Sequence, residues 1–399
     1  MNGGEVDMPE LADLHSCTGC SACASVCNNN SLVMVPDENG FMYPEFVNPD
    51  NCTKCGCCEN VCPVLNPNSI DAQENCACAA YSINEDIRKQ SSSGGVFTEL
   101  AFKTIDEDGV VYGAAYGSDF SVQHICISSK AELFRLRGAK YSQSVLGNSF
   151  RVIRKRLENG QKVLFSGTPC QVAGLKAFLK KDYFNLITVD FVCHGIPSPM
   201  VWQAYIKYRA EQDADGQRPI AINLRSKHTG WSRYQYSNLY QYGNGASYSA
   251  KGSDDLFMKL FVGDYINRES CANCVFKGYD RVSDLTIGDF WGIWDIMPEL
   301  DDDKGISVVL AHSQKGRDVL KDCRENLRIK LVTLEQTSVQ NPSMLYVFPT
   351  KENRAEVLEQ IRHGKIDEME KLFSKQKQWG GTEKMSKKVT QIIRHFWKS

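Results

Sequence analysis

The hydrophobic positions of this chain alternate between short apolar runs and stretches with helical spacing. Residues 163–165 form one apolar run, and a turn at 166–170 separates it from helically spaced apolar positions that begin at Val172. A second apolar run covers residues 186–192, and a strand-like segment covers residues 283–294. Strands that alternate with helices are typical of an α/β domain. Ligands of open α/β sheets bind outside the carboxyl ends of the strands, so the segments that follow these runs are candidates for a binding site.

A helix is predicted just after the serine- and glycine-rich stretch at residues 91–95. Ser93 is placed to cap it, and its apolar positions share one face: Phe97, Leu100, Ala101 and Ile105. Gly94 and Gly95 leave the first amides without side-chain cover, so a phosphate group can approach them closely. The segment therefore predicts either a site for a nucleotide pyrophosphate or an ordinary capped helix without a ligand.

The first seventy residues have a pattern of their own. β-Branched and aromatic residues lie on both sides of a turn signal at residues 36–40, as they do in a hairpin. The polar stretch at 66–75 indicates a linker. We therefore place a domain boundary near residue 70.

The last fifty residues are predicted to be helical. Residues 351–375 have the charge pattern of a surface helix or helix pair that breaks at His363 and Gly364. Residues 383–399 form an amphipathic pattern with lysine and arginine on the polar face. We expect this last helix to pack on its own domain, and peripheral contact with an anionic membrane is the alternative.

Charge and composition exclude several classes of partner and site. The 48 acidic and 46 basic residues give a formal charge of −2, which offers no general attraction for nucleic acid. The first residues lack the basic and apolar segments of a signal peptide, and no apolar run approaches the roughly 18 residues of a membrane span. We therefore expect a cytoplasmic protein. In that reducing compartment, dense cysteines indicate metal binding or redox chemistry rather than disulfides.

The densest cysteine pattern is a repeated ferredoxin motif. The spacing C-x2-C-x2-C-x3-C-P occurs at residues 52–63, and the same thiol spacing occurs at residues 17–27, where Asn28 replaces the proline. The fourth cysteine of this motif binds the other of two clusters, whereas a zinc site pairs two cysteines with a distant second pair. Cys57 lies outside the spacing and is not an expected ligand. The sequence predicts two [4Fe–4S] clusters, one on Cys17, Cys20, Cys23 and Cys62 and the other on Cys52, Cys55, Cys58 and Cys27.

Four cysteines of the larger domain form a second candidate set. Cys170 and Cys193 follow two of the apolar runs, and Cys271 and Cys274 form a C-x2-C pair. Their spacing fits a third [4Fe–4S] cluster and a four-cysteine zinc site equally well. Cys170 also has a nucleophile interpretation, because a thiol at a helix N-terminus has a lowered pKa and His194 can assist it.

Several motifs, in this order, resemble one known family. They are SSSGGVFT, RGAKYSQS, FSGTPCQVAGL, DFVCHGIPSP, CANC and DLTIGDFWG. This combination resembles the coenzyme F420-reducing hydrogenase/dehydrogenase beta-subunit family over residues 76–345. The resemblance implies a flavoprotein that binds FAD without a G-x-G-x-x-G motif and holds a [4Fe–4S] cluster beside the flavin. It implies that this cluster's ligands are Cys170, Cys193, Cys271 and Cys274.

The resemblance also implies flavin-binding segments. They contain Ser93, Gly94, Gly95, Lys140, Ser142, Gly167 and Thr168. Lys140 is suited to stabilising negative charge on reduced flavin or a phosphate, and a solvated surface lysine is the alternative. Trp291 and Trp294 are either stacking partners of a ring or core aromatics.

The expected architecture is therefore α+β or α/β in three parts. Residues 1–70 form a small ferredoxin-like domain with two [4Fe–4S] clusters, residues 71–350 form a larger α/β flavin-binding domain, and residues 351–399 form a helical tail. Clusters pass single electrons and a flavin can deliver hydride, so we expect an oxidoreductase. Its expected partners are a redox protein or ferredoxin and a small hydride donor or acceptor, either F420 or another molecule. A non-catalytic electron-transfer subunit and a cysteine-based redox regulator are the alternatives.

Overall fold

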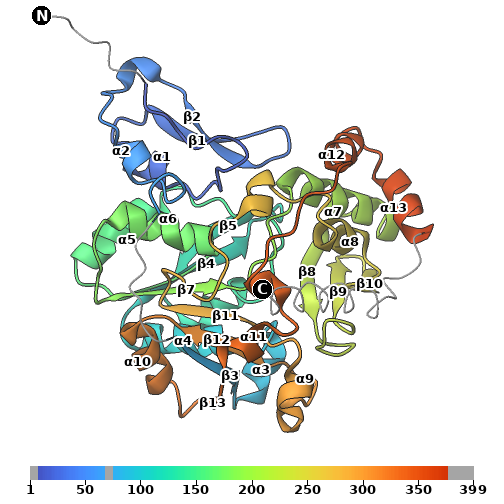
Figure 1. Cartoon of the computed structure of the whole chain (residues 1–399). Helices are drawn as coiled ribbons and strands as arrows, with labels where there is room; N and C mark the ends of the chain where they lie inside the picture. Colours follow the sequence, from blue (N-terminus) through green and yellow to red (C-terminus); the bar gives the residue numbers. More distant parts are fainter. Residues whose placement is uncertain (1–7, 68–74, 376–399) are drawn as a thin grey trace, which may run out of the picture.

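The computed structural model describes residues 8–67 and 75–375, which form an N-terminal module, a large mixed sheet covered by helices, and a lateral lobe (Figure 1). The module contains α1 (Ala22–Val26), β1 (Leu32–Pro36), β2 (Met42–Phe46), η1 (Pro49–Asn51) and α2 (Cys57–Asn60). β1 and β2 pair antiparallel, so the predicted hairpin is confirmed. Its turn is stabilised by the Asp37 carboxylate, which accepts hydrogen bonds from the amides of Asn39 at 2.9 Å and Phe41 at 2.8 Å.

The large sheet has eight strands in the order β13-β3-β12-β11-β7-β6-β4-β5. Their bounds are β3 (Cys76–Ser82), β4 (Val110–Tyr116), β5 (Val122–Ile127), β6 (Val163–Ser166), β7 (Leu186–Phe191), β11 (Leu285–Asp289), β12 (Ser307–Ala311) and β13 (Leu327–Val332). Four adjacent strands in the centre of the sheet, β11, β7, β6 and β4, run parallel to one another. The strands outside this group pair antiparallel with their neighbours. The strands predicted from the apolar runs are therefore β6, β7 and β11, side by side in the parallel core.

Helices cover both faces of this sheet because alternate residues of its buried strands point to opposite sides. Leu164 packs with α4 (Val96–Asp106) and α10 (Gln314–Asp322). Its neighbours Val163 and Phe165 pack with α5 (Ser149–Glu158) and α6 (Pro169–Leu179). The predicted helix after residue 170 is confirmed as α6. The remaining short helices of this part are α3 (Glu85–Gln90), η2 (Lys130–Arg135), α9 (Ile293–Ile296), η4 (Pro298–Leu300), α11 (Leu334–Ser338) and η5 (Pro342–Met344).

The lateral lobe has an aromatic core of its own. It contains α7 (Pro199–Asp213), β8 (Pro219–Ser226), β9 (Ser237–Tyr242), β10 (Ser247–Lys251), α8 (Leu256–Val262), η3 (Glu269–Asn273), α12 (Arg354–Arg362) and α13 (Ile366–Lys375). Leu358 of α12 and Met369 of α13 pack in one hydrophobic cluster with residues of α7 and α8. Figure 1 shows α12 and α13 beside these two helices. The predicted helix pair is confirmed, and Gly364 between the two helices has a φ of 79°. The division at residue 350 stays a prediction, and residues 383–399 lie outside the described residues.

The start of α4 differs from the sequence prediction. The helix begins at Val96, its N-cap is Gly95 with a φ of 88°, and no side chain caps it. The Ser93 hydroxyl instead donates to the Ile306 carbonyl at 2.8 Å. The expected Ser93 cap is therefore wrong, because the left-handed turn at Gly95 moves the start of the helix two residues along the chain.

Candidate functional site

Three cysteines of the first motif and one of the second meet in the N-terminal module. Cys17, Cys20, Cys23 and Cys62 line one small cavity. Burial raises the pKa of the Cys20 thiol to about 12, and the neighbouring thiols Cys17 and Cys62 add to this effect. We call these four residues the inner set. Four thiols that converge in a desolvated pocket fit a metal cluster, because binding to iron stabilises thiolates that burial alone disfavours.

The other ferredoxin cysteines include one exposed thiol. Cys55 is exposed, and its pKa is lowered, chiefly by a hydrogen bond from the backbone of Cys57. Cys58 lies close enough to Cys55 for their charges to interact, and Cys57 interacts in the same way with Cys27. The Cys52 sulfur accepts a hydrogen bond from the Lys54 amide at 3.4 Å. We call Cys27, Cys52, Cys55 and Cys58 the outer set, and Cys57 is its neighbour.

The structure also brings together the four cysteines of the larger domain. Cys170 interacts electrostatically with Cys274 and Cys193, and Cys271 interacts with Cys170 and Cys274. Burial raises the pKa of Cys193 and of Cys271 to about 12. These four residues are the third set. They come from the ends of two parallel strands and from η3, so only the tertiary fold makes them neighbours.

In none of the three sets are the cysteines placed as ligands of one ion. Within residues 8–67 and 75–375, no three Cys, His, Asp or Glu side chains are arranged to hold a single metal ion.

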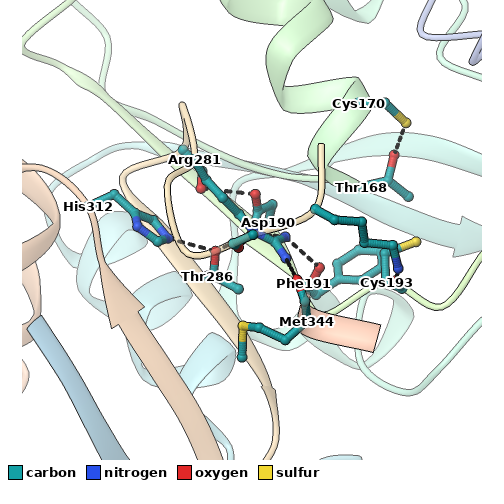
Figure 2. Close-up of polar contacts among 12 residues, drawn as sticks. Thr168, Cys170, Asp190, Phe191, Cys193, Arg281, Thr286, His312 and Met344 are labelled. Carbon is teal, nitrogen blue, oxygen red and sulfur yellow. Dashed lines mark hydrogen bonds and ion pairs between the residues drawn. The ribbon is translucent and has the colours of Figure 1, made fainter. Parts of the chain in front are cut away.

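The surroundings of Cys170 do not favour the nucleophile interpretation. Burial raises the pKa of its thiol instead of lowering it, and Thr168 Oγ1 lies 3.1 Å from the sulfur (Figure 2). His194 faces other groups: its Nε2 is 3.0 Å from an Asp264 oxygen and its Nδ1 is 3.3 Å from the Ser343 hydroxyl. The thiol lies in the first turn of α6, but loss of solvent outweighs the effect of the helix start.

Local sequence explains why α6 begins where it does. Thr168 is the N-cap, Pro169 follows at the first turn, and Thr168 and Gln171 form a capping box. The Gln171 amide also donates to the Ser144 hydroxyl at 3.0 Å, which ties the helix start to the segment that follows Lys140. Cys170 therefore lies between the turn at Gly167 and Thr168 and the segment around Lys140, two of the segments that the family resemblance relates to flavin binding.

A cavity of about 2340 Å³ opens next to the third set. Its wall includes Cys170, Cys193 and six of the seven residues expected to bind flavin: Ser93, Gly95, Lys140, Ser142, Gly167 and Thr168. Gly94 is not part of this wall. Its amide donates to the Ser307 hydroxyl, and a Cβ there would lie 2.4 Å from the Ala80 carbonyl oxygen. Close packing therefore explains the glycine at position 94.

Lys140 lies in the cavity wall, where its ammonium group loses its proton more readily than a lysine in water does. Burial lowers the pKa of its ammonium group to about 7. The group donates to three carbonyls, the nearest being that of Arg137 at 2.6 Å. Lys140 is half-buried and not fully solvated, and an anion bound in the cavity would stabilise its charged form.

The cavity wall also contains a buried arginine that sequence spacing did not identify. Arg225 pairs with Asp289 at 2.8 Å and lies 4.2 Å from the ring centre of Tyr236. Trp291 also lines the cavity and stacks on Trp231 with ring centres 5.0 Å apart. Arg225 and its partners Tyr236 and Asp289 are far apart in the sequence, so no local motif identifies this arginine, whereas Trp291 lies in the motif DLTIGDFWG. Trp294 packs in a hydrophobic cluster, as its core interpretation expected.

A buried polar network holds the strand that leads to Cys193 (Figure 2). Arg281 pairs with Asp190 at 3.3 Å and donates to the carbonyls of Phe191 and Met344. The Asp190 carboxylate also accepts from Thr286 at 2.5 Å. Burial raises the pKa of Asp190, and the nearby Arg281 opposes that increase. The network fixes the end of β7, from which the Cys193 segment departs.

The inner set lies directly on α6. A Cβ on Gly174 would be 2.9 Å from both the Cβ and the sulfur of Cys20, and the Cys20 charge acts on Cys170. Arg151 of α5 also contacts the module by donating to the carbonyls of Ser25 at 2.8 Å and Ala24 at 3.1 Å. The inner set and the third set are therefore neighbours across the junction between module and sheet.

None of the helices in residues 8–67 and 75–375 combines the length and apolarity that a bilayer crossing requires.

Comparison with solved structures gives a distant likeness. One is the F420-reducing [NiFe] hydrogenase complex from Methanosarcina barkeri, with 16% sequence identity, 77% of this chain and 93% of that chain covered, and a TM-score of 0.43. No curated protein matches this chain significantly.

Family models account for most of the described residues. Residues 77–150 match the N-terminal part of the coenzyme F420 hydrogenase/dehydrogenase beta subunit, and residues 160–337 match the C terminus of the same beta subunit. Residues 16–66 match the 4Fe-4S dicluster domain, so the module carries two [4Fe–4S] clusters. The chain thus belongs to the coenzyme F420 hydrogenase/dehydrogenase beta-subunit family, as an iron–sulfur oxidoreductase with a dicluster domain in front.

Proposed function

We propose that this chain is an iron–sulfur flavoprotein oxidoreductase with FAD and three [4Fe–4S] clusters, one on each cysteine set. Its substrate is a small organic hydride donor or acceptor, either coenzyme F420 or another molecule. When bound, the clusters supply one-electron transfer and the flavin supplies hydride transfer. In this proposal the ferredoxin domain ends near residue 70 and the flavin domain near residue 350.

The observation that carries the proposal is the order of the cysteine sets in space. Cys55 of the outer set is exposed, the inner set packs on α6, and Cys170 at the start of α6 lies in the cavity wall. The series of sets thus begins at Cys55, which is exposed, and ends at Cys170, whose thiol is removed from solvent. A redox protein can therefore contact the outer set, and the third set lies where a cavity ligand would accept or donate electrons.

The chain's own residues would orient a flavin in that cavity. Ligand cavities commonly measure about 300–1,000 Å³, so this one is large enough for a flavin and a second molecule. Gly167 and Thr168 form the turn between β6 and α6, and Lys140 lies in the wall of the same cavity. A phosphate or an electron-rich ring near Lys140 would raise the pKa of its ammonium group again, since an anion stabilises the charged form.

The direct test is the cofactor content of anaerobically purified protein with Cys170→Ser beside it. We expect about twelve iron, twelve sulfide and one FAD per chain, falling to about eight iron and eight sulfide in Cys170→Ser. Cys126→Ser is the matched control, because Cys126 is a half-buried thiol outside all three sets. Eight iron without flavin in the unmodified protein would contradict the proposal and leave an electron-transfer subunit that lacks its own hydride chemistry.

A further inference from the structure

One buried arginine has no carboxylate partner. Six arginines among the described residues are at least nine-tenths buried: Arg88, Arg209, Arg225, Arg268, Arg281 and Arg354. Five of them form ion pairs, with Asp302, Asp213, Asp289, Asp190 and Glu269 respectively. Within the part of the chain that the structure describes, Arg268 has no such pair, although it is only 1% exposed.

Arg268 spans the junction between the large domain and the module. Its backbone precedes η3, which carries Cys271, and its amide donates to the Ile196 carbonyl at 2.8 Å. Its side chain enters the module, where Nε donates to the Cys17 carbonyl at 2.8 Å and the guanidinium lies 3.8 Å from the ring centre of Tyr43. The cation is therefore between a cysteine of the inner set and a cysteine of the third set.

Not all of the hydrogen-bond donors of the guanidinium have an acceptor. Nη1 is 3.5 Å from the Gln143 side-chain oxygen, and Nη2 is buried without an oxygen or nitrogen acceptor among the described residues. Burial raises the pKa of Cys17, and the charge of Arg268 acts against that increase, as it does at Cys271. Each of these contacts is to a neutral group or to a cysteine.

A buried charge is stable only when an opposite charge or a metal site compensates for the lost hydration. Clusters held by four thiolates are anionic, so they provide the missing counter-charge. We propose that Arg268 is a positioning residue whose fixed positive charge raises the reduction potential of the inner cluster. The inference rests on the proposed assignment of Cys17, Cys20, Cys23 and Cys62 to that cluster.

The direction of the effect follows from electrostatics. One electron from a redox protein of the ferredoxin class adds one negative charge to the cluster that accepts it, and no bond forms or breaks. A fixed cation nearby stabilises that reduced form, the more so in a site from which water is excluded. The main influences on the pKa values of Cys55 and Cys58 do not include Arg268, so the potential of the outer cluster should depend less on this residue.

The test is a redox titration of the anaerobic full-length protein with dithionite, followed by electron paramagnetic resonance. In Arg268→Met we expect the ratio of reduced to oxidised inner cluster at a fixed potential to fall at least tenfold, which equals 59 mV for a one-electron couple. Arg268→Lys keeps the charge and should restore most of the unmodified value. Cys55→Ser, which removes a ligand of the outer set, identifies which signal belongs to which cluster.

Arg209→Met is the matched control, because Arg209 is a buried arginine of α7 with its own partner Asp213. An unchanged inner potential in Arg268→Met, or an equal shift in Arg209→Met, would overturn the inference. If Arg268→Met binds less iron, Arg268→Gln replaces it as a neutral variant that still donates a hydrogen bond. Cluster loss from both neutral variants but not from Arg268→Lys supports the inference, whereas loss from all three overturns it. Iron and flavin in the unmodified protein report separately on the proposed function.

Discussion

At the scale of single residues, His124 should make stability depend on pH. Burial lowers the pKa of its imidazole to about 4, although the Ser166 carbonyl, 2.9 Å from Nε2, acts in the opposite direction. The buried Nδ1 has no partner among the described residues. The unfolded chain takes up a proton near its ordinary pKa of 6.5, whereas the folded chain does not. The histidine therefore favours the folded state less and less as pH falls from 6.5 to 4, by up to about 3 kcal/mol.

The variant His124→Gln keeps a donor for the Ser166 carbonyl and removes this titration. We expect the free energy of unfolding of the unmodified protein to decrease more steeply than that of His124→Gln between about pH 6.5 and 5. Denaturant unfolding of anaerobic protein at several pH values measures both slopes. Parallel slopes would show that His124 titrates normally in the folded state.

Single-residue roles were predictable where local spacing determines them. The spacing of the ferredoxin motifs indicated that Cys62 joins Cys17 and its neighbours, and the structure places these thiols together. A lowered pKa was expected for Cys170, whereas burial raises it, because the sequence shows a helix start but not the loss of solvent around it. Arg268 was missed for a related reason: its partners lie more than 100 residues away along the chain.

At the scale of elements, Gly174 shows how a helix is adapted to the module. Alanine is about 1 kcal/mol better than glycine in a helix interior, so propensity alone predicts that Gly174→Ala stabilises α6. The contact of 2.9 Å with Cys20 predicts the opposite, because a Cβ there displaces the inner set. We expect the contact to prevail and Gly174→Ala to lower the free energy of unfolding by about 1–3 kcal/mol.

Denaturant unfolding measures this change, and iron content shows whether the inner cluster is retained. Gly243→Ala is the control, because a Cβ there would have only the Ile220 side chain as a neighbour, at 3.8 Å. A Gly174→Ala protein as stable as the unmodified one, with all its iron, would mean that the module shifts away from α6 at no cost.

Elements were predictable where hydrophobic periodicity is local. The apolar runs identified β6, β7 and β11, and the stripe after residue 170 identified α6. The order of the sheet was not predictable, because β3 pairs with β12 and β13, which follow it by more than 200 residues. The start of α4 was misplaced because a glycine with a positive φ acts as the N-cap there, in place of the serine that the sequence favours.

At the scale of the whole molecule, Arg151 is one of the arginines that join the module to the large domain. Arg151 donates to carbonyls of the last turn of α1 and the residue that follows it, those of Ala24, Ser25 and Cys27. Helix ends leave such carbonyls without partners, and a cation there also meets the negative end of the helix dipole. In the proposed function, electrons pass between the inner and third sets, so this junction would have to stay closed.

Replacing Arg151 should therefore loosen the module without unfolding the large domain. Each hydrogen bond from a charged donor contributes about 1.5–3 kcal/mol, so Arg151→Met should speed hydrogen exchange in residues 22–30 at least tenfold. Exchange in β6 and β7 should stay unchanged. Arg154→Met is the matched control, because Arg154 lies on the same helix but stacks on Phe178 of α6, 3.6 Å from its ring centre. Equal exchange in both variants would mean that contacts at Gly174 and Arg268 hold the module in place without Arg151.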